Sequence, residues 1–401
     1  MRRHRRHARP HSMTNMSNVT TPDKARDPVP TFAVILPRRE VYQKAGAGAV
    51  SLCVRDITAN SRYRDSTLVF GEPVAEPLEP PRLIPVTPSP WIFMRRASRY
   101  LAGVIKALRN HPAALIEIHN RPIYVDALHK AFPGTPLLLY LHNDPRTMRG
   151  LKEASQRRHI LEKVAAVVCV SDFIRRCMLD GLQDHPQQDK VQVVLNGVDT
   201  SLIRPVAGES RRKEIVFVGR LVPEKGGLLF ARAAVALRQR LPEWRFVLIG
   251  ARRLSPGGSK YGSEVVTEME RLGDQGEITG YIRRDHVMGR MARASIAVIP
   301  SLWDDPCPLT AIEAMSSGCA VVASNRGGLP EIVDEAGLMF SPRNVDELIQ
   351  HLFTLTANPY ILEQYQRLAR QRAERALDIR RCAARLDSVR RELTQMEEVT
   401  G

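Results

Sequence analysis

The chain has 401 residues, of which 43% are hydrophobic, 5% aromatic and 25% charged. At roughly 150 residues per domain this length predicts two or three domains, and the hydrophobic share is ordinary for a globular protein. No apolar run reaches the ~18 residues that a membrane-spanning helix needs. The basic N-terminus also lacks the apolar segment of a secretory signal. We therefore expect neither a membrane-spanning nor a secreted protein.

The formal net charge is +16, which favours anionic partners such as nucleic acid, acidic lipid or a phosphorylated saccharide. An arginine-rich composition can also follow from the base composition of a genome. Aromatic residues are few and no module with stacking aromatics is visible, so we expect no nucleic-acid partner. The six cysteines have neither zinc-site nor disulfide spacing, which indicates a reducing, cytoplasmic location.

Residues 1–30 are polar and rich in arginine and proline, and they are predicted to be a disordered basic tail. After them, short apolar runs typical of buried parallel strands alternate with helical patterns. In the first half we predict strands within residues 31–37, 66–71, 82–86, 114–122, 136–145, 164–181 and 191–200.

A helix is predicted from Trp91 to Asn110, with an apolar stripe and several arginines and lysines. A basic amphipathic helix can lie on an anionic membrane surface. It can equally pack its apolar stripe on the sheet, and the sequence leaves both readings open.

The strand–helix rhythm restarts after a polar connection, and we place a domain boundary near residue 207. Further strands are predicted within residues 214–219, 245–253, 277–282, 294–301 and 320–323. Strands that alternate with helices twice over predict an α/β protein with two doubly wound domains facing each other across a cleft. Long charged helices are expected from Pro359 to Glu398.

Two features of the first half suit a ligand. Gly46 and Gly48 open a helix and would let a ligand approach the backbone, although G-x-G-x-x-S is a weak dinucleotide fingerprint. Two strands end in His-Asn, at His119 and His142. Ligands of open α/β sheets bind beyond the carboxyl ends of strands. His142 is therefore a candidate for ligand contact, whereas His119 is interpreted as structural.

The stretch from Pro300 to Val333 reads as a loop, a helix from about Leu309, a buried strand and a Gly-Gly turn. Unpaired N–H groups and the helix dipole make a helix N-terminus an anion site. Asp305 and Glu313 lie on either side of that helix end. A sugar nucleotide, with hydroxyls on both sides of a diphosphate, has a matching layout. The alternative is an acidic loop followed by a capped surface helix.

Several segments together resemble, in order and spacing, the retaining sugar-nucleotide glycosyltransferases of glycosyltransferase family 4. The segments are NGVDT, FVGRLVPEKG, LIG, ITGYI, IPSLWDDPCPLTAIEAMSSGCAVVAS and GGLPEIV. The resemblance implies a GT-B fold of two Rossmann-like domains. The acceptor-binding domain would comprise residues 31–207 with a final helix from about 378 to 401 crossing back to it, and the donor-binding domain residues 208–377.

Within the family, other segments look most like lipopolysaccharide-core hexosyl- and N-acetylglucosaminyltransferases. These segments are PRREVYQKAGAGAVSL, IHNRP, YLHND and ARRLSPGGSKYGSE. The implied acceptor is a saccharide or lipid-linked glycan of a lipopolysaccharide or exopolysaccharide, used at the inner face of the cell membrane.

The resemblance implies that Arg220 and Lys225 bind the donor diphosphate. Pre-placed cations stabilise the charge that develops on a leaving diphosphate, and arginine offers a rigid fork of donors. The N–H groups of Leu309 and Thr310 would add to this site, and Gly48 would let the N-terminal loop close on the phosphates.

The resemblance also assigns the sugar and base contacts. Glu313 would accept hydrogen bonds from the ribose hydroxyls and Asp305 would hold hydroxyls of the donor sugar. His142 would contact the sugar near the acceptor, and Tyr281 and Ile282 would flank the nucleobase. We expect His142, Arg220, Lys225 and Asp305 to be the catalytic residues.

The sequence departs from the family in one place. The family usually carries two glutamates, and the first is here Asp305, while a Phe-Gly pair is replaced by Cys307 and Pro308. The donor sugar is therefore left open, as is the choice among UDP, GDP and ADP sugars. We expect no metal and no cofactor besides the donor, and retention by front-face attack.

Three other functions are compatible with parts of the sequence. A nucleotide-sugar epimerase could use the same fold without a polymeric acceptor. A basic binding protein that has lost catalysis is disfavoured by Arg220, Lys225 and Glu313. An NAD-dependent dehydrogenase is disfavoured by the poor glycine pattern.

Overall fold

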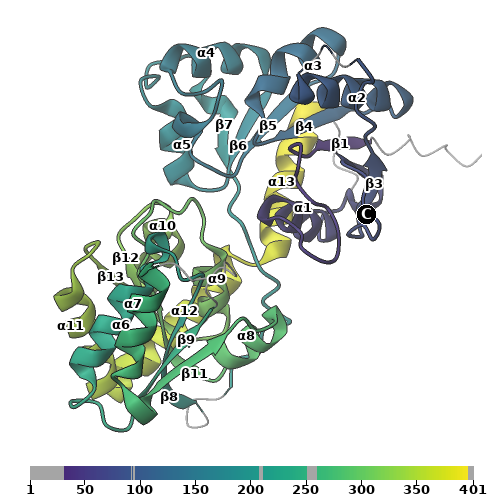
Figure 1. Cartoon of the computed structure of the whole chain (residues 1–401). Coiled ribbons are helices and arrows are strands. Elements are labelled where there is room, and N and C mark those ends of the chain that lie inside the picture. Colours follow the sequence, from purple (N-terminus) through teal and green to yellow (C-terminus); the bar gives the residue numbers. More distant parts are fainter. Residues whose placement is uncertain (1–30, 92, 94, 207–210, 251–259, 396–401) are drawn as a thin grey trace, which may run out of the picture.

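A computed structural model describes residues 31–91, 93, 95–206, 211–250 and 260–395 (Figure 1). The predicted basic tail, the boundary near residue 207, part of the segment ARRLSPGGSKYGSE and the last six residues lie outside these ranges. The described chain forms two lobes, each built around a parallel β-sheet with helices on its faces. The prediction of two doubly wound α/β units is confirmed.

The first sheet contains seven strands in the order β3-β2-β1-β4-β5-β6-β7. Every residue of β1, β4, β5 and β6 is buried, which explains why these strands read as continuous apolar runs. Their bounds are β1 (Phe32–Ile35), β2 (Thr67–Gly71), β3 (Arg82–Pro85), β4 (Leu115–His119), β5 (Leu137–Leu141), β6 (Ala166–Cys169) and β7 (Val191–Val193).

Helices connect these parallel strands. Ser171 caps α5, because its hydroxyl oxygen accepts a hydrogen bond from the backbone N–H of Ile174. The helices are α1 (Ala49–Ala59), α2 (Arg96–Asn110), α3 (Val125–Ala131), α4 (Ala154–Lys163) and α5 (Asp172–Leu179).

The prediction that a helix begins at Trp91 is wrong, because α2 begins at Arg96. Ser89 explains the late start: its N–H donates to the carbonyl of Arg99, and its carbonyl accepts from Arg99 Nε at 2.6 Å. Ser89 therefore lies beside the first turn of α2, and the described residues just before Arg96 do not extend the helix. The apolar stripe of α2 packs on the sheet, with Val104 and Leu108 buried.

The second sheet contains six strands in the order β10-β9-β8-β11-β12-β13. The sequence did not predict β13, a short half-buried strand at the sheet edge. The bounds are β8 (Arg212–Val218), β9 (Arg245–Ile249), β10 (Gly276–Gly280), β11 (Ala294–Ile299), β12 (Ala320–Ser324) and β13 (Gly337–Phe340).

Alternating side chains of β8 fill two cores. Ile215 and Phe217 pack with α6 (Gly227–Leu237), α7 (Lys260–Glu270) and α11 (Val345–Ala357). Val216, on the opposite face, belongs to the core that includes α9 and α12. The remaining helices of this lobe are α8 (Arg284–Met291), α9 (Leu309–Ser316), α10 (Leu329–Val333) and α12 (Pro359–Ala376).

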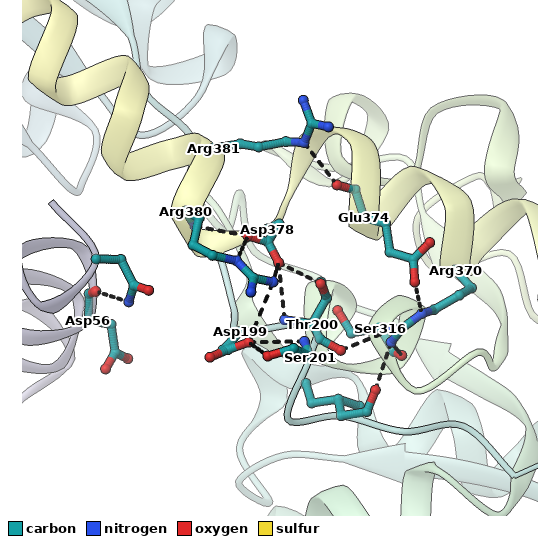
Figure 2. Close-up of polar contacts among 12 residues, drawn as sticks. Asp56, Asp199, Thr200, Ser201, Ser316, Arg370, Glu374, Asp378, Arg380 and Arg381 are labelled. Atoms are coloured by element: carbon teal, nitrogen blue, oxygen red, sulfur yellow. Dashed lines mark hydrogen bonds and ion pairs between the residues drawn. The ribbon is translucent and has the colours of Figure 1, made fainter. Parts of the chain in front are cut away.

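The chain passes between the lobes twice, and the two passages are bonded to each other. Val198 donates its N–H to the carbonyl of Leu377 and accepts from the N–H of Ile379, at 3.0 and 2.9 Å. Figure 2 shows the Asp378 carboxylate beside this bridge, accepting hydrogen bonds from Thr200 and from the guanidinium of Arg380. Burial alone would raise the pKa of Asp378, but these donors hold it well below its usual value.

Arg370 of α12 fastens the same passage to the second lobe. Its guanidinium donates to the carbonyls of Thr200 and Ile203 in the first passage and to the carbonyl of Ser316 at the end of α9 (Figure 2). The connection between the lobes is thus anchored directly to α9.

The last helix, α13 (Ile379–Thr394), crosses back to the first lobe as expected, and Figure 1 shows it in yellow beside β4 and α1. Its Arg390 is 1% exposed and pairs with Glu117 of β4, which is equally buried. Arg390 Nε lies 2.6 Å from Glu117 Oε1, and Nη2 lies 3.1 Å from Oε2. Arg390 also contacts Ser61 and Asp387.

Apart from the two chain passages, a polar contact between α10 and α5 joins the lobes directly. The carboxylate of Glu331 in α10 accepts hydrogen bonds from the N–H groups of Asp172 and Phe173, at 2.7 and 3.2 Å. These groups belong to the first turn of α5, where the helix dipole favours a negative charge. Among the described residues, no helix is both long and apolar enough to span a bilayer.

We predict that Arg390→Leu lowers the free energy of unfolding by about 3–5 kcal/mol, because it leaves the buried Glu117 carboxylate without its partner. Thermal unfolding monitored by calorimetry measures the effect. Arg385→Leu is the matched control, since Arg385 lies exposed on the same helix and makes one 3.4 Å hydrogen bond to Gln192. Equal melting temperatures for the two variants would contradict the structural role of the Arg390–Glu117 pair.

Candidate functional site

The Gly327–Gly328 turn packs against the loop that carries Asp305 and is hydrogen-bonded to it. Gly328 N–H donates to the Asp305 carbonyl at 2.8 Å. Gly327 has a φ of +56°, and a Cβ atom there would lie 2.6 Å from the backbone nitrogen of Asp305. Only glycine fits this close approach in a left-handed conformation. The turn therefore fixes the position of the Asp305 backbone.

Asp305 and Lys225, both predicted site residues, lie together. Lys225 Nζ is 2.6 Å from Asp305 Oδ2, and the two side chains are partly buried. Lys225 follows β8 in a turn that packs against Ser301 and Leu302, which donate to the Glu224 carbonyl. Arg220, in the same loop, is exposed and forms no ion pair with any carboxylate in the described ranges.

The start of α9 is an open helix end, as predicted. Pro308 occupies the N-cap position and offers no side-chain hydrogen bond. Within the described chain, the backbone N–H groups of Leu309 and Thr310 have no hydrogen-bond acceptor. These two donors point out of the first turn of α9 and can bind an anion.

Glu313, one turn further into α9, is buried and paired with Arg284 at the start of α8. Arg284 Nε and Nη2 lie 2.9 and 2.6 Å from Glu313 Oε1. Burial raises the pKa of Glu313, although the guanidinium acts in the opposite direction. Both contacts use Oε1, so Oε2 is left for another hydrogen-bond donor.

The first lobe presents His142 to the same region. Its Nε2 lies 2.9 Å from Nδ1 of His119. His142 and His119 line a small cavity between the lobes that also includes Leu309 of α9 and Asn196 and Gly197 of the first passage. Burial lowers the pKa of His142 well below its usual value. The structure thus brings His142 and the start of α9 to one place.

Gly48 is the N-cap residue of α1, as predicted. The carboxylate of Glu40 lies against it, and Glu40 Oε1 accepts a hydrogen bond from the N–H of Ser51 at 3.0 Å. The position at the start of α1 that a phosphate was expected to take is therefore filled by a carboxylate in this conformation.

Tyr281 and Ile282 directly follow β10. Tyr281 is 83% exposed and Ile282 is half-buried against the core. A wider cleft of about 790 Å³ lies nearby, between α1 and α8, and Arg284 lines it.

In the described part of the chain, no group of three or more histidine, cysteine, aspartate or glutamate side chains is placed to hold a metal ion.

Two family models match the chain, one on each lobe. Residues 59–202 match the model described as Glycosyltransferase Family 4, and residues 212–358 match the model described as Glycosyl transferases group 1. HepE of Anabaena, solved in complex with UDP, superposes with a TM-score of 0.71 at 20% identity, over 91% of this chain and 100% of HepE. The chain belongs to the GT-B glycosyltransferases. The predicted fold and family are confirmed.

Relatives of this glycosyltransferase are moderately similar in sequence. YtcC of Bacillus subtilis, which is named as a glycosyltransferase, is 27% identical over 315 residues. The match covers 72% of this chain and 75% of YtcC. The lipopolysaccharide 1,2-N-acetylglucosaminetransferase of Salmonella typhimurium is 23% identical over 231 residues, or 55% of this chain and 57% of its own.

Sequence reasoning missed three residues of this glycosyltransferase site. Arg284 pairs with Glu313, Glu40 lies at the start of α1, and Glu117 lies behind His119. One signal was available: Glu117 is the only charged residue in the apolar strand LIEIH, and a buried charge needs a partner. Arg284 and its partner Glu313 are 29 residues apart in the sequence, and Glu40 precedes its partner Ser51 by 11 residues, so no local pattern signals either contact.

We predict that Gly327→Ala destabilises the glycosyltransferase by about 1–3 kcal/mol, because alanine is strained at positive φ and its Cβ displaces Asp305. Gly134→Ala is the control, since a Cβ there meets nothing within 4 Å. Thermal unfolding compares the two. A Gly327→Ala variant as stable as Gly134→Ala would show that the turn does not fix Asp305.

Proposed function

We propose that this glycosyltransferase moves a hexose or N-acetylhexosamine from a nucleotide-diphospho-sugar to a saccharide or lipid-linked acceptor, with retention of configuration. The acceptor would belong to lipopolysaccharide or exopolysaccharide synthesis. The observation that carries the proposal is the Lys225–Asp305 pair beside the open start of α9, with His142 facing it from the other lobe.

The diphosphate half of the proposal rests on unpaired donors. Arg220 is exposed, Lys225 has three donor positions of which Asp305 takes one, and the N–H groups of Leu309 and Thr310 are open. Such a set suits two phosphates, and HepE was solved with UDP and with UDP-glucose. We therefore propose a UDP sugar as the first donor to test, with GDP and ADP sugars as alternatives.

The sugar and ribose contacts follow from the two acids. Asp305 can share its carboxylate between Lys225 and a hydroxyl of the donor sugar, so the cation and the sugar are held together. Glu313 can accept a ribose hydroxyl at Oε2, because Arg284 contacts Oε1. The nucleotide would then lie between α8 and α9.

In the proposed reaction, the bond between C1 of the sugar and the phosphate oxygen breaks, and the electron pair goes to that oxygen. The acceptor hydroxyl oxygen bonds to C1 on the same face, and its proton passes to the departing phosphate oxygen. Lys225, Arg220 and the α9 N–H groups stabilise the negative charge on the leaving diphosphate. In this proposal the cations take the part that a metal ion plays in other transferases.

The first test is a thermal-shift panel of UDP-, GDP- and ADP-glucose and the matching N-acetylglucosamine nucleotides. Binding stabilises the fold by RT ln(1 + [L]/Kd), so a donor at ~100 Kd adds ~2.7 kcal/mol. We expect one nucleotide class to shift the melting temperature by several degrees. The absence of a shift with every nucleotide sugar would rule out the donor site.

The second test uses variants with the donor that binds. Lys225→Ala and Glu313→Ala are expected to lower acceptor-independent donor hydrolysis by about 100-fold, because each removes a group that holds the diphosphate or the ribose. Lys213→Ala is the control, since Lys213 is an exposed lysine that pairs only with Glu243 at the surface of the same lobe. Wild-type rates in both site variants would refute their roles, and conversion of the donor to its epimer would favour the epimerase alternative.

A peripheral membrane contact is also proposed. Trp91 and Phe93 are 69% and 93% exposed, and the exposed Arg95 and Arg96 follow them at the start of α2. Aromatic side chains settle at the membrane interface, and each nearby arginine adds about 1 kcal/mol on an anionic surface. This patch supports an acceptor that is presented at a membrane.

We expect the protein to sediment with phosphatidylglycerol vesicles but not with phosphatidylcholine vesicles, and Trp91→Ala/Phe93→Ala to release it. Tyr360→Ala is the control, because Tyr360 is an aromatic residue of the other lobe with 74% exposure. Equal vesicle binding by the double variant and the control would show that the patch is not the membrane contact.

A further inference from the structure

Three aromatic rings and two charged side chains form a row behind the proposed sugar site, and all of them are buried except His142, which is half-buried. Glu117 and His119 are two residues apart on β4, so they lie on the same face of the sheet. The strand register places His119 opposite Tyr140 of β5, and His142 follows two residues later. The ring of Tyr140 stacks on His119 and on His142, with centroids 4.8 and 4.7 Å apart.

Polar contacts run along this row from α13 to the cavity. Arg390 of α13 holds both oxygens of Glu117. Glu117 Oε2 lies 3.8 Å from His119 Nε2, and His119 Nδ1 lies 2.9 Å from His142 Nε2. His119 Nε2 is buried and, among the described residues, has no other polar atom to bond. The carboxylate is therefore the group that decides which nitrogen of His119 carries the proton.

The charges of the row allow one arrangement of protons. Burial lowers the pKa of His119 and of His142, and Arg390 holds Glu117 ionised, so both imidazoles are neutral at neutral pH. A lone pair on His119 Nε2 facing a buried carboxylate would be repelled, so this nitrogen carries the hydrogen. Its Nδ1 then accepts a hydrogen bond, and the hydrogen in the contact belongs to Nε2 of His142.

We propose that Glu117 and His119 are positioning residues that fix His142 as the Nε2–H tautomer, so that its Nδ1 accepts a hydrogen bond from a sugar hydroxyl. A neutral nitrogen with a lone pair repels phosphate oxygens but accepts from hydroxyls. His142 therefore serves the sugar and not the diphosphate. The identity of the ligand as a sugar rests on the proposed function, whereas the tautomer does not.

The kinetic test compares two substitutions of His119. His119→Asn places an oxygen acceptor near the position of Nδ1, and His119→Leu has no acceptor. We expect His119→Leu to lower kcat for UDP-glucose hydrolysis by about 100-fold with KM within about threefold of wild type, because the reacting geometry and not the binding is lost. His119→Asn should recover most of that loss. His159→Leu, at an exposed histidine of α4, is the control.

The proton positions are tested directly by ¹⁵N chemical shifts of the full chain labelled at histidine, with the His142 signals assigned from their loss in His142→Gln. We expect an Nδ1 shift typical of an unprotonated nitrogen and an Nε2 shift typical of N–H. A proton on His142 Nδ1, or equal kcat for His119→Asn and His119→Leu, would overturn the proposal. If the wild type neither binds nor hydrolyses any nucleotide sugar, the proposed function fails, and the tautomer measurement still decides this inference.

Discussion

The structure depends on one constraint, the bonding of the two chain passages to each other between the lobes. Val198 and the Leu377–Ile379 segment form the bridge, and the Asp378 carboxylate draws Thr200 and Arg380 onto it. Because Arg370 extends the same network to the end of α9, the position of that helix is tied to the connection between the lobes. A rotation of one lobe against the other would pivot here, close to the cavity that His142 and Leu309 share.

Much of this architecture could be predicted because the relevant signals are local. A parallel strand that is buried on both faces is a short apolar run, so the buried strands of both sheets were predicted from the sequence. The start of α9 was found from Pro308, since proline tolerates the first turn of a helix. The late start of α2 was not found, because the Ser89–Arg99 hydrogen bonds that fix it are not encoded in helical periodicity. The edge strand β13 was missed because it is short and half-buried.

For the candidate site too, local motifs could be read from the sequence, whereas contacts between distant residues could not. Lys225 and Asp305 were predicted from motifs, and the structure places them in contact. The contact is observed, whereas the roles assigned to these two residues stay predictions, as do those of Arg220, Tyr281 and Ile282. The partner of Glu313 could not be read from the sequence, because Arg284 is one of many arginines in a chain of net charge +16. Likewise, Arg390 is one basic residue among several in α13, and only the fold shows that it faces Glu117.

The crossing of α13 to the first lobe affects how lobes could be exchanged between glycosyltransferases to make chimeras. The segment after Ile379 is last in the chain but supplies the counter-charge for a carboxylate in the middle of the first sheet. A chimera that joins a new second lobe to this first lobe at the first passage alone would bring a foreign final helix, and Glu117 would face whatever residue that helix carries. The natural unit of exchange is therefore discontinuous, and it takes α13 together with the first lobe.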